Sequence, residues 1–145
     1  MMIDSTQAVK IFIEQVYYQV YQAAIHASES VLQEDPPKGM KESDEAKLKQ
    51  WFLTLSEEDK KNVLQVVKET AQLSVFCFLV LIDNKKVGYP IEDEVSDLAL
   101  YYQTYENEEN CYNYKPAESI RINMSYSEED LHDEFLYMVH DLEHG

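Results

Sequence analysis

Glycine and proline are scarce in this sequence, with three and four residues respectively among 145. With hydrophobic residues at 45%, this composition excludes collagen-like and disordered classes and fits one globular domain. The three glycines, Gly39, Gly88 and Gly145, form no glycine-rich loop of the kind that binds phosphate, and no Gly-x-Ser-x-Gly motif is present. Nucleotide binding and a serine nucleophile therefore have no support, and we expect no cofactor and no catalytic residue.

Positive charge is also scarce, because 12 basic residues stand against 28 acidic ones and leave a net charge of −16. Arg121 is the one arginine. Nucleic acids and anionic membrane surfaces are negatively charged, so neither is expected as a partner. Residues 83–145 hold 16 acids and four bases, against 12 acids and eight bases in residues 1–82. A basic protein that meets the later part of the chain fits this asymmetry, although excess acid also keeps a cytosolic protein soluble.

Cysteines and long apolar runs are few as well. Cys77 and Cys111 lie far apart in the sequence, and the N-terminus does not resemble a secretory signal. This predicts two reduced thiols in a cytoplasmic protein. The longest apolar run, Val75 to Ile82, is shorter than the roughly 20 residues that cross a bilayer. We therefore expect no membrane segment.

A long amphipathic helix is expected from Asp4 to about Gln33, with Asp4 and Gln7 as its capping pair. Its apolar residues recur in steps of four and three, which predicts burial of Val9, Ile13, Val16, Val20, Ala23 and Ala27. The same spacing resembles a coiled-coil heptad, so self-association through this helix stays open. The residues EDPPKGM at 34–40 end the helix because they include two prolines and a glycine.

Two further helices are expected before residue 83. The first is short and spans about 44–53. The second starts at Ser56, whose hydroxyl can cap it, with Glu57, Glu58 and Asp59 in its first turn. It leads into VFCFLVLI at 75–82, which is apolar all round and therefore predicts burial on every side. The β-branched and aromatic residues of this run would equally suit a buried strand.

Beyond the turn residues DNKKVGYP at 83–90, the apolar period changes toward two, which predicts an antiparallel β-meander at about 97–124. A hairpin is expected from a strand at 98–105, the loop ENEEN and a return strand at 111–115, followed by a third strand at 119–124. Ser127 then starts a C-terminal helix to about residue 142. Its expected buried residues are Leu131, Phe135, Met138, Val139 and Leu142.

The C-terminal helix also carries imidazole and carboxylate side chains that a divalent metal could bind: His132, Asp133, Glu134, His140, Asp141, Glu143 and His144. Two helical ligands usually stand three or four residues apart, whereas His132 and His140 are separated by eight, or about 12 Å along the axis. We therefore interpret the cluster as a solvated helix face and expect no metal. A metal-assisted hydrolase is the least favoured hypothesis.

The segment YYQTYENEENCYNY at 101–114 places five tyrosines around a glutamate-rich loop. Tyrosine offers a large apolar face with a polar tip and is enriched at binding hot spots, and acids around it attract a basic partner. The predicted partner-binding residues are Tyr101, Tyr102, Tyr105, Glu106, Glu108, Glu109, Tyr112 and Tyr114. The alternative is that these tyrosines only cover a half-exposed sheet.

Two segments resemble known proteins. Asp97-Leu98-Ala99-Leu100-Tyr101-Tyr102, followed by acids, resembles the tyrosine pair with acidic surroundings in bacterial nuclease-toxin immunity proteins, which are helical and smaller than this chain. FCFLVLIDN at 76–84 together with LHDEF at 131–135 is similar to a layout in small uncharacterised bacterial proteins, some of them grouped with immunity proteins. The resemblance implies a protein that binds its toxin tightly and blocks its active site or an essential surface.

The sequence thus predicts a single α+β domain over residues 1–145, with helices over about 4–83, the meander over about 97–124 and a C-terminal helix over about 127–142. Its expected function is that of a non-enzymatic, cytoplasmic immunity or antitoxin protein that binds a basic protein, such as a toxin. The alternative is an adaptor or regulator that forms a homodimer through its N-terminal helix.

Overall fold

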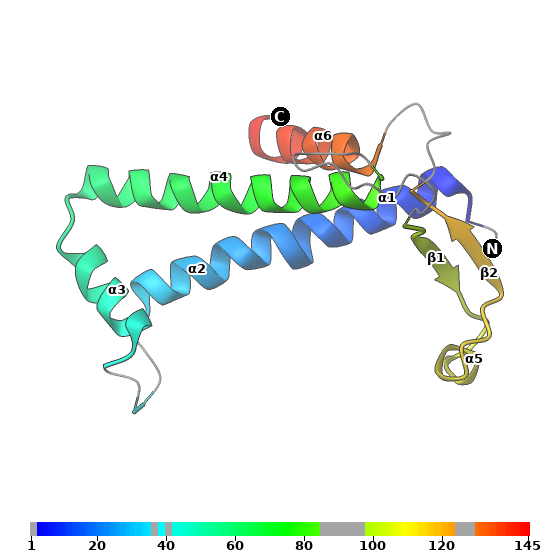
Figure 1. The fold of residues 1–145 in the computed structure, drawn as a ribbon, viewed down its shortest axis with the longest axis horizontal. Helices are drawn as coiled ribbons and strands as arrows, with labels where there is room; N and C mark the ends of the chain where they lie inside the picture. Colours follow the sequence, from blue (N-terminus) through cyan, green and yellow to red (C-terminus); the bar gives the residue numbers. More distant parts are fainter. Residues whose placement is uncertain (1–2, 36–37, 40–41, 85–97, 124–129) are drawn as a thin grey trace, which may run out of the picture. The chain divides into compact units, whose positions relative to one another are not determined.

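A computed structural model describes residues 3–35, 38–39, 42–84, 98–123 and 130–145 of the chain, and its fold is α+β as predicted. Figure 1 shows the order of its elements. The chain divides into two compact units. Unit 1 comprises Met1–Tyr17 and Phe76–Gly145, and unit 2 comprises Tyr18–Val75. The predicted single domain 1–145 stays a prediction, because a division by internal contacts does not test whether the units fold separately.

The predicted N-terminal helix is confirmed as one helical run made of α1 (Ser5–Gln15), the π-helical segment η1 (Val16–Gln22) and α2 (Ala23–Gln33). Its start is a capping box. Gln7 N–H donates to Asp4 Oδ1 at 2.8 Å, and Asp4 N–H donates to Gln7 Oε1 at 3.2 Å. Two N-terminal amides that lack a partner within the helix are satisfied in this way.

The buried face of this run differs from the prediction after Val16. Ile13 is followed in steps of four by Tyr17, Tyr21 and Ile25, all of them buried. A π-helical turn holds more residues than an α-helical turn, so η1 rotates the buried face relative to a 3.6-residue repeat. The predicted burial is therefore wrong for Val20, Ala23 and Ala27, which are exposed.

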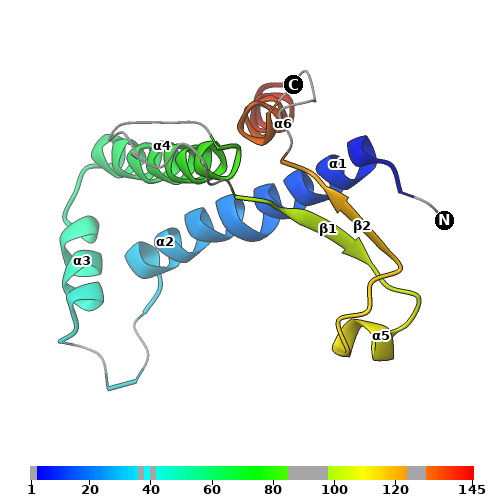
Figure 2. The ribbon, with the colours of Figure 1, turned by 45° about the vertical axis from the view of Figure 1, so that its right-hand side comes forward.

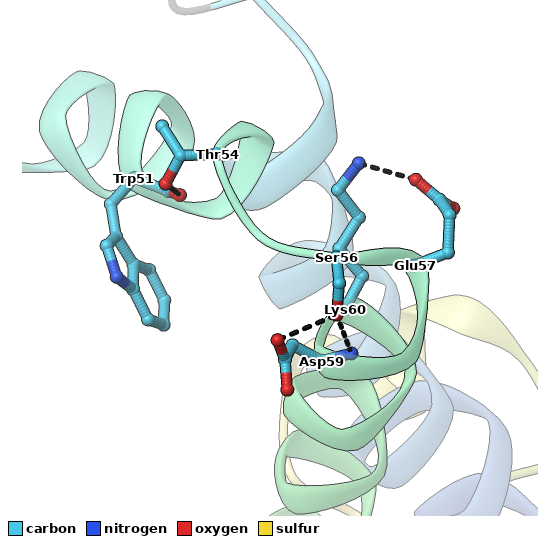
Figure 3. A network of polar contacts seen from close by, with 6 residues as sticks. All are labelled: Trp51, Thr54, Ser56, Glu57, Asp59 and Lys60. Carbon is cyan, nitrogen blue, oxygen red and sulfur yellow. Dashed lines mark hydrogen bonds and ion pairs between the residues drawn. The ribbon is translucent and has the colours of Figure 1, made fainter.

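Unit 2 contains α2, α3 (Asp44–Leu53) and the first part of α4 (Glu57–Ile82), and α2 packs against α3. The short helix at 44–53 and the cap at Ser56 are confirmed. Figure 3 shows that Ser56 Oγ accepts from Asp59 N–H at 3.1 Å and donates to Asp59 Oδ2 at 2.7 Å. Beside it, Lys60 donates to Glu57 Oε1 at 2.8 Å, and this hydrogen bond lowers the pKa of Glu57.

Residues 75–82 are helical, but their predicted burial on every side is wrong. Leu79 and Val80 are buried, whereas Cys77 is exposed and the exposed fraction of Phe78 is 60%. Side chains project from every side of a helix, and only one side of α4 is buried. The apolar composition of residues 75–82 therefore overestimates how many of them are buried.

By length and composition, α4 is long and apolar enough to span a membrane, with a mean hydropathy of 1.5 over 18 residues, of which 17% are buried. The sequence prediction of no membrane segment considered the run at 75–82 alone. Lys68 and Glu69 lie near the middle of α4 but close to the N-terminal end of its apolar part. Length and composition do not distinguish a membrane span from a helix of a soluble protein, so the expected absence of a membrane segment stays a prediction.

The sheet in unit 1 has two strands among the described residues, β1 (Tyr101–Thr104) and β2 (Glu118–Arg121), paired antiparallel from Tyr101 opposite Arg121 to Thr104 opposite Glu118. The predicted return strand at 111–115 is wrong, since α5 (Glu108–Tyr112) includes its first two residues and the other three are not in a strand. Asn107 Oδ1 accepts from Asn110 N–H at 2.8 Å and caps α5. This local helix signal outweighs the strand preference of the tyrosines.

The C-terminal helix, α6 (Leu131–His144), packs on α1 within unit 1 and buries Leu131, Phe135 and Val139 as predicted. Met138 is half-buried, and the predicted burial of Leu142 is wrong, because this residue is exposed in the last turn. The predicted start at Ser127 and the inward face of Met124 lie outside the described residues. The N-cap of the described helix is Asp130.

Three consecutive residues at the end of α4 bind the elements that follow, and we call them the α4 junction: Ile82, Asp83 and Asn84. The carbonyl of Ile82 accepts from Asn123 Nδ2 at 2.6 Å, just beyond β2. Asn84 has φ 59°, a left-handed conformation that asparagine tolerates, and its side chain accepts from Leu98 N–H at 2.7 Å and donates to the Leu98 carbonyl at 3.0 Å.

The middle residue of the junction, Asp83, holds the start of α6. Its Oδ2 accepts from His132 N–H at 3.0 Å and lies 2.7 Å from His132 Nδ1. The side chains of Asp83 and His132 are 2% and 15% exposed. The rings of His132 and Phe76 are also nearly perpendicular, with ring centroids 5.3 Å apart. Asp83 therefore satisfies a helix N-terminus and orients an imidazole from within the interior of unit 1.

Replacing Asp83 tests this contact. Asp83→Ala leaves a half-buried imidazole N–H and a helix N-terminal amide without their acceptor, so we expect the free energy of unfolding to fall by about 3 kcal/mol. Urea denaturation followed by circular dichroism measures the change. Asp141→Ala, on the exposed side of α6, is the control and should change stability by no more than about 0.5 kcal/mol. Equal effects of the two substitutions would contradict the role of Asp83.

Candidate partner-binding site

The predicted partner-binding residues lie on the β1–β2 hairpin and on the segment 105–116 that joins its strands, which we call the hairpin tip. In both views α5 stands at the end of the two strands, away from α1 and α6 of the same unit (Figure 1 and Figure 2). The tip contains six of the eight predicted residues: Tyr105, Glu106, Glu108, Glu109, Tyr112 and Tyr114. The three glutamates are exposed, and the exposed fractions of Tyr112 and Tyr114 are 81% and 85%.

The structure separates the tyrosine pair at 101–102. Successive strand residues point to opposite faces, and the register places Tyr102 opposite Ile120 and Tyr101 opposite Arg121. Tyr102 and Ile120 are half-buried on one face of the sheet, whereas Tyr101 is exposed on the other. One partner surface therefore cannot contact both rings of the pair from the same side. Tyr102 belongs with the residues that support the hairpin.

Tyr101 and Gln103 share the exposed face of β1, and the chain continues from them into the tip. The Tyr105 hydroxyl donates to Gln103 Oε1 at 3.0 Å, which holds the ring of Tyr105 beside the strand. Gln103 in turn donates to Ser119 Oγ at 3.4 Å across the two strands. Tyr101 thus extends the tip along the side of the hairpin on which Tyr105 lies.

The tip is electronegative. Its charged residues are Glu106, Glu108, Glu109 and Lys115, of which three are acidic and one is basic. Glu108 and Glu109 occupy the first turn of α5, where carboxylates are favoured by the positive end of the helix. They are exposed, so their charge is available to a partner in solution.

Tyr114 ends α5 in a backbone conformation that favours glycine. Its φ is 53°, in the left-handed region. Tyr114 N–H donates to the Cys111 carbonyl at 3.1 Å, and Lys115 N–H donates to the Asn110 carbonyl at 2.8 Å. These two bonds form a Schellman motif with Tyr114 at C′, the position that glycine occupies most often.

A bulky residue in the left-handed region costs roughly 1–2 kcal/mol. With its ring 85% exposed, Tyr114 recovers little of this by packing. Strain of this kind concentrates at functional sites. The sequence predicted Tyr114 as a binding residue but not its strained backbone. That strain follows from its C′ position, which is known only once α5 is seen to end at residue 112.

Charge also distinguishes the two units. The residues of unit 1 include 18 acids and five bases, a net charge of −13, and those of unit 2 include 10 acids and seven bases, a net charge of −3. The hairpin tip belongs to unit 1. A cationic partner would be attracted mainly to unit 1, which carries Tyr101, Tyr112 and Tyr114.

The alternative, self-association through the N-terminal helix, stays a prediction, because part of the predicted face is buried and part of it is exposed. Ile13 and Val16 are buried, while Val20 is exposed. Unit 2 also has an apolar groove between α3 and α4, lined by Trp51, Leu55, Asp59, Asn62, Val63, Val66 and Val67. Nothing in the described residues identifies an occupant for it, so the groove is not part of the candidate site.

The histidine cluster on α6 is not one solvated face as predicted. His140 is exposed, but His132 is largely buried against Asp83, which precedes it by 49 residues. Comparing the spacing of histidines within one helix could not find this contact. Asp83 lies in the segment FCFLVLIDN and His132 in LHDEF, but no contact between these segments was predicted from the sequence.

The strain at Tyr114 predicts opposite effects for one substitution at two neighbouring tyrosines. Tyr114→Gly relieves a left-handed non-glycine residue and should raise the free energy of unfolding by about 1 kcal/mol. Tyr112→Gly places glycine inside α5 and should lower it by about 1 kcal/mol. Urea denaturation of both variants measures the difference. Destabilisation by Tyr114→Gly would show that its ring contributes to the fold.

The candidate site is therefore the hairpin tip together with Tyr101, and Tyr102 supports it from the opposite face. It combines exposed aromatic rings with exposed carboxylates. Within unit 1, it lies at the far end of the hairpin from α6. Comparisons with protein-family models, with curated protein sequences and with solved structures found no match to this chain.

Proposed function

We propose that this chain is an acidic protein-binding module that captures a basic protein through the hairpin tip and Tyr101. The observation that carries the proposal is the exposure of Tyr112 and Tyr114, 81% and 85%, beside three exposed glutamates. Exposed tyrosines on a sheet can be incidental, but a tyrosine kept where glycine is more stable requires a reason. Contact with a partner supplies one.

The chemistry of the tip suits a cationic surface. The glutamates attract lysine and arginine side chains over several ångströms and speed encounter. The tyrosine rings then bury apolar area, and their faces can hold a guanidinium or ammonium group through a cation–π interaction. Charge would set the rate of association, and the buried rings would set the rate of release.

The most concrete form of this function is that of a bacterial immunity or antitoxin protein. The resemblance of the segment at 97–102 to nuclease-toxin immunity proteins supports it, as does the net charge of −16. Such a protein is not an enzyme. It would act in the cytoplasm by covering the active site or an essential surface of a basic effector. A nuclease that binds nucleic acid phosphate presents the kind of basic surface that the tip fits.

Affinity capture from the native host tests the proposal. The tagged chain should retain one basic protein at low salt, and retention should fall at high salt because screening weakens the charge attraction. Tyr112→Ala combined with Tyr114→Ala should reduce retention at least tenfold, which corresponds to about 1.4 kcal/mol or more of binding free energy. Mass spectrometry identifies the retained protein, and a binding isotherm measures its affinity.

Two controls make this experiment decisive. Tyr137→Ala removes a tyrosine that is 54% exposed on α6 and should leave retention unchanged. Circular dichroism confirms that every variant is folded. The proposal fails if the retained protein binds the double variant as well as it binds the wild type, or if Tyr137→Ala weakens binding to the same degree.

A further inference from the structure

Three potential metal ligands meet at the start of α6. Asp130, His132 and Asp133 each offer one ligand atom, and these atoms lie within 4.8 Å of one another. All three side chains are half-buried. They come from one helix start and the residue that precedes it, so α6 itself sets their spacing. This cluster lies outside the hairpin tip and has no part in the proposed function.

The imidazole of His132 is held in the orientation that metal sites use. Since an ionised carboxylate can only accept, the 2.7 Å contact with Asp83 Oδ2 places a proton on His132 Nδ1. Nε2 then presents a lone pair in the neutral ring. Metal-binding histidines nearly always donate their second ring N–H to a carboxylate, carbonyl or water in this way. Asp83, with its side chain 2% exposed, is that carboxylate here.

The next neighbour of Nε2 is also an oxygen. Asp133 Oδ1 lies 3.6 Å from it, too far for a good hydrogen bond. Two ligands that bind one ion tetrahedrally at about 2.1 Å stand roughly 3.4 Å apart, so the observed separation suits a shared cation. A lone pair and a carboxylate oxygen that face each other without a proton or a cation between them would repel.

A second histidine–aspartate pair on α6 provides a contrast. His140 Nδ1 and Asp141 Oδ1 are also 3.6 Å apart, but their side chains are 73% and 81% exposed. Neither side chain is held in place by burial, so the cost of fixing both side chains would fall on metal binding. The 3.6 Å separation therefore suits a metal ion in the His132–Asp133 pair but gives no such indication in the exposed His140–Asp141 pair.

We propose that Asp130, His132 and Asp133 bind a divalent transition-metal ion, with Asp83 as the positioning residue behind the imidazole. One nitrogen and two carboxylate ligands without a thiolate suit zinc or manganese. Three protein ligands leave at least one coordination position for water. The ion would join Asp130 and Asp133 to the residue that Asp83 already holds, and it would stabilise the start of α6 against the end of α4.

Isothermal titration of the full-length chain with zinc chloride tests the site. His140 and His144 are four residues apart on α6 and could bind zinc as a surface pair, so the titration uses the His140→Ala variant. This variant should bind one zinc ion per chain, and zinc should raise its thermal midpoint. In the same background, Asp133→Asn should weaken zinc binding at least tenfold, whereas Asp141→Asn should leave it unchanged.

Asp133 is 44% exposed, so Asp133→Asn should keep the metal-free thermal midpoint of its parent, which separates loss of a ligand from loss of the fold. The proposal is overturned if the His140→Ala protein takes up no zinc. It is also overturned if Asp133→Asn and Asp141→Asn bind zinc equally well.

Discussion

The end of α4 is the constraint on which unit 1 depends. Ile82, Asp83 and Asn84 are consecutive, yet they bind Asn123 after β2, His132 in α6 and Leu98 before β1. Asp83 and Asn123 are buried polar residues, and such groups are costly unless their hydrogen bonds are made. A displacement of any one of these elements would leave a buried donor or acceptor without its partner, so the junction fixes their positions together.

Anchoring at one end leaves the other end of the hairpin free for recognition. Asn123 also accepts from Leu100 N–H at 2.7 Å, so both strands are held where they enter and leave the sheet. An isolated two-stranded hairpin is marginally stable in water, and this anchor supplies the support that the sheet itself lacks. The tip therefore carries exposed tyrosines, carboxylates and a strained backbone without contributing to the interior.

Helix starts that depend on hydrogen bonds between nearby residues were predictable from the sequence. Contacts between residues far apart in the sequence were not. The capping residues Asp4 and Ser56 mark helix starts because their hydrogen bonds span three residues. The rotated face beyond Val16 depends on a π-helical segment, and periodicity assumes 3.6 residues per turn. At the candidate site, the residues were predicted but their arrangement was not, because the faces of Tyr101 and Tyr102 follow from pairing with β2. The contact of Asp83 with His132 could not be predicted from the residues around Asp83 or from those around His132, because it joins two helices that are far apart in the sequence.

Native-state hydrogen exchange as a function of urea tests the α4 junction most directly. The amides of Leu98, Leu100 and His132 each donate to a side chain of the junction or of Asn123, and Asp83 N–H donates to the Leu79 carbonyl at 2.8 Å. If the junction holds these elements as one cooperative unit, the four amides should open with the same free energy and the same dependence on urea. Exchange of His132 through a small, urea-independent opening while Asp83 stays protected would contradict the account.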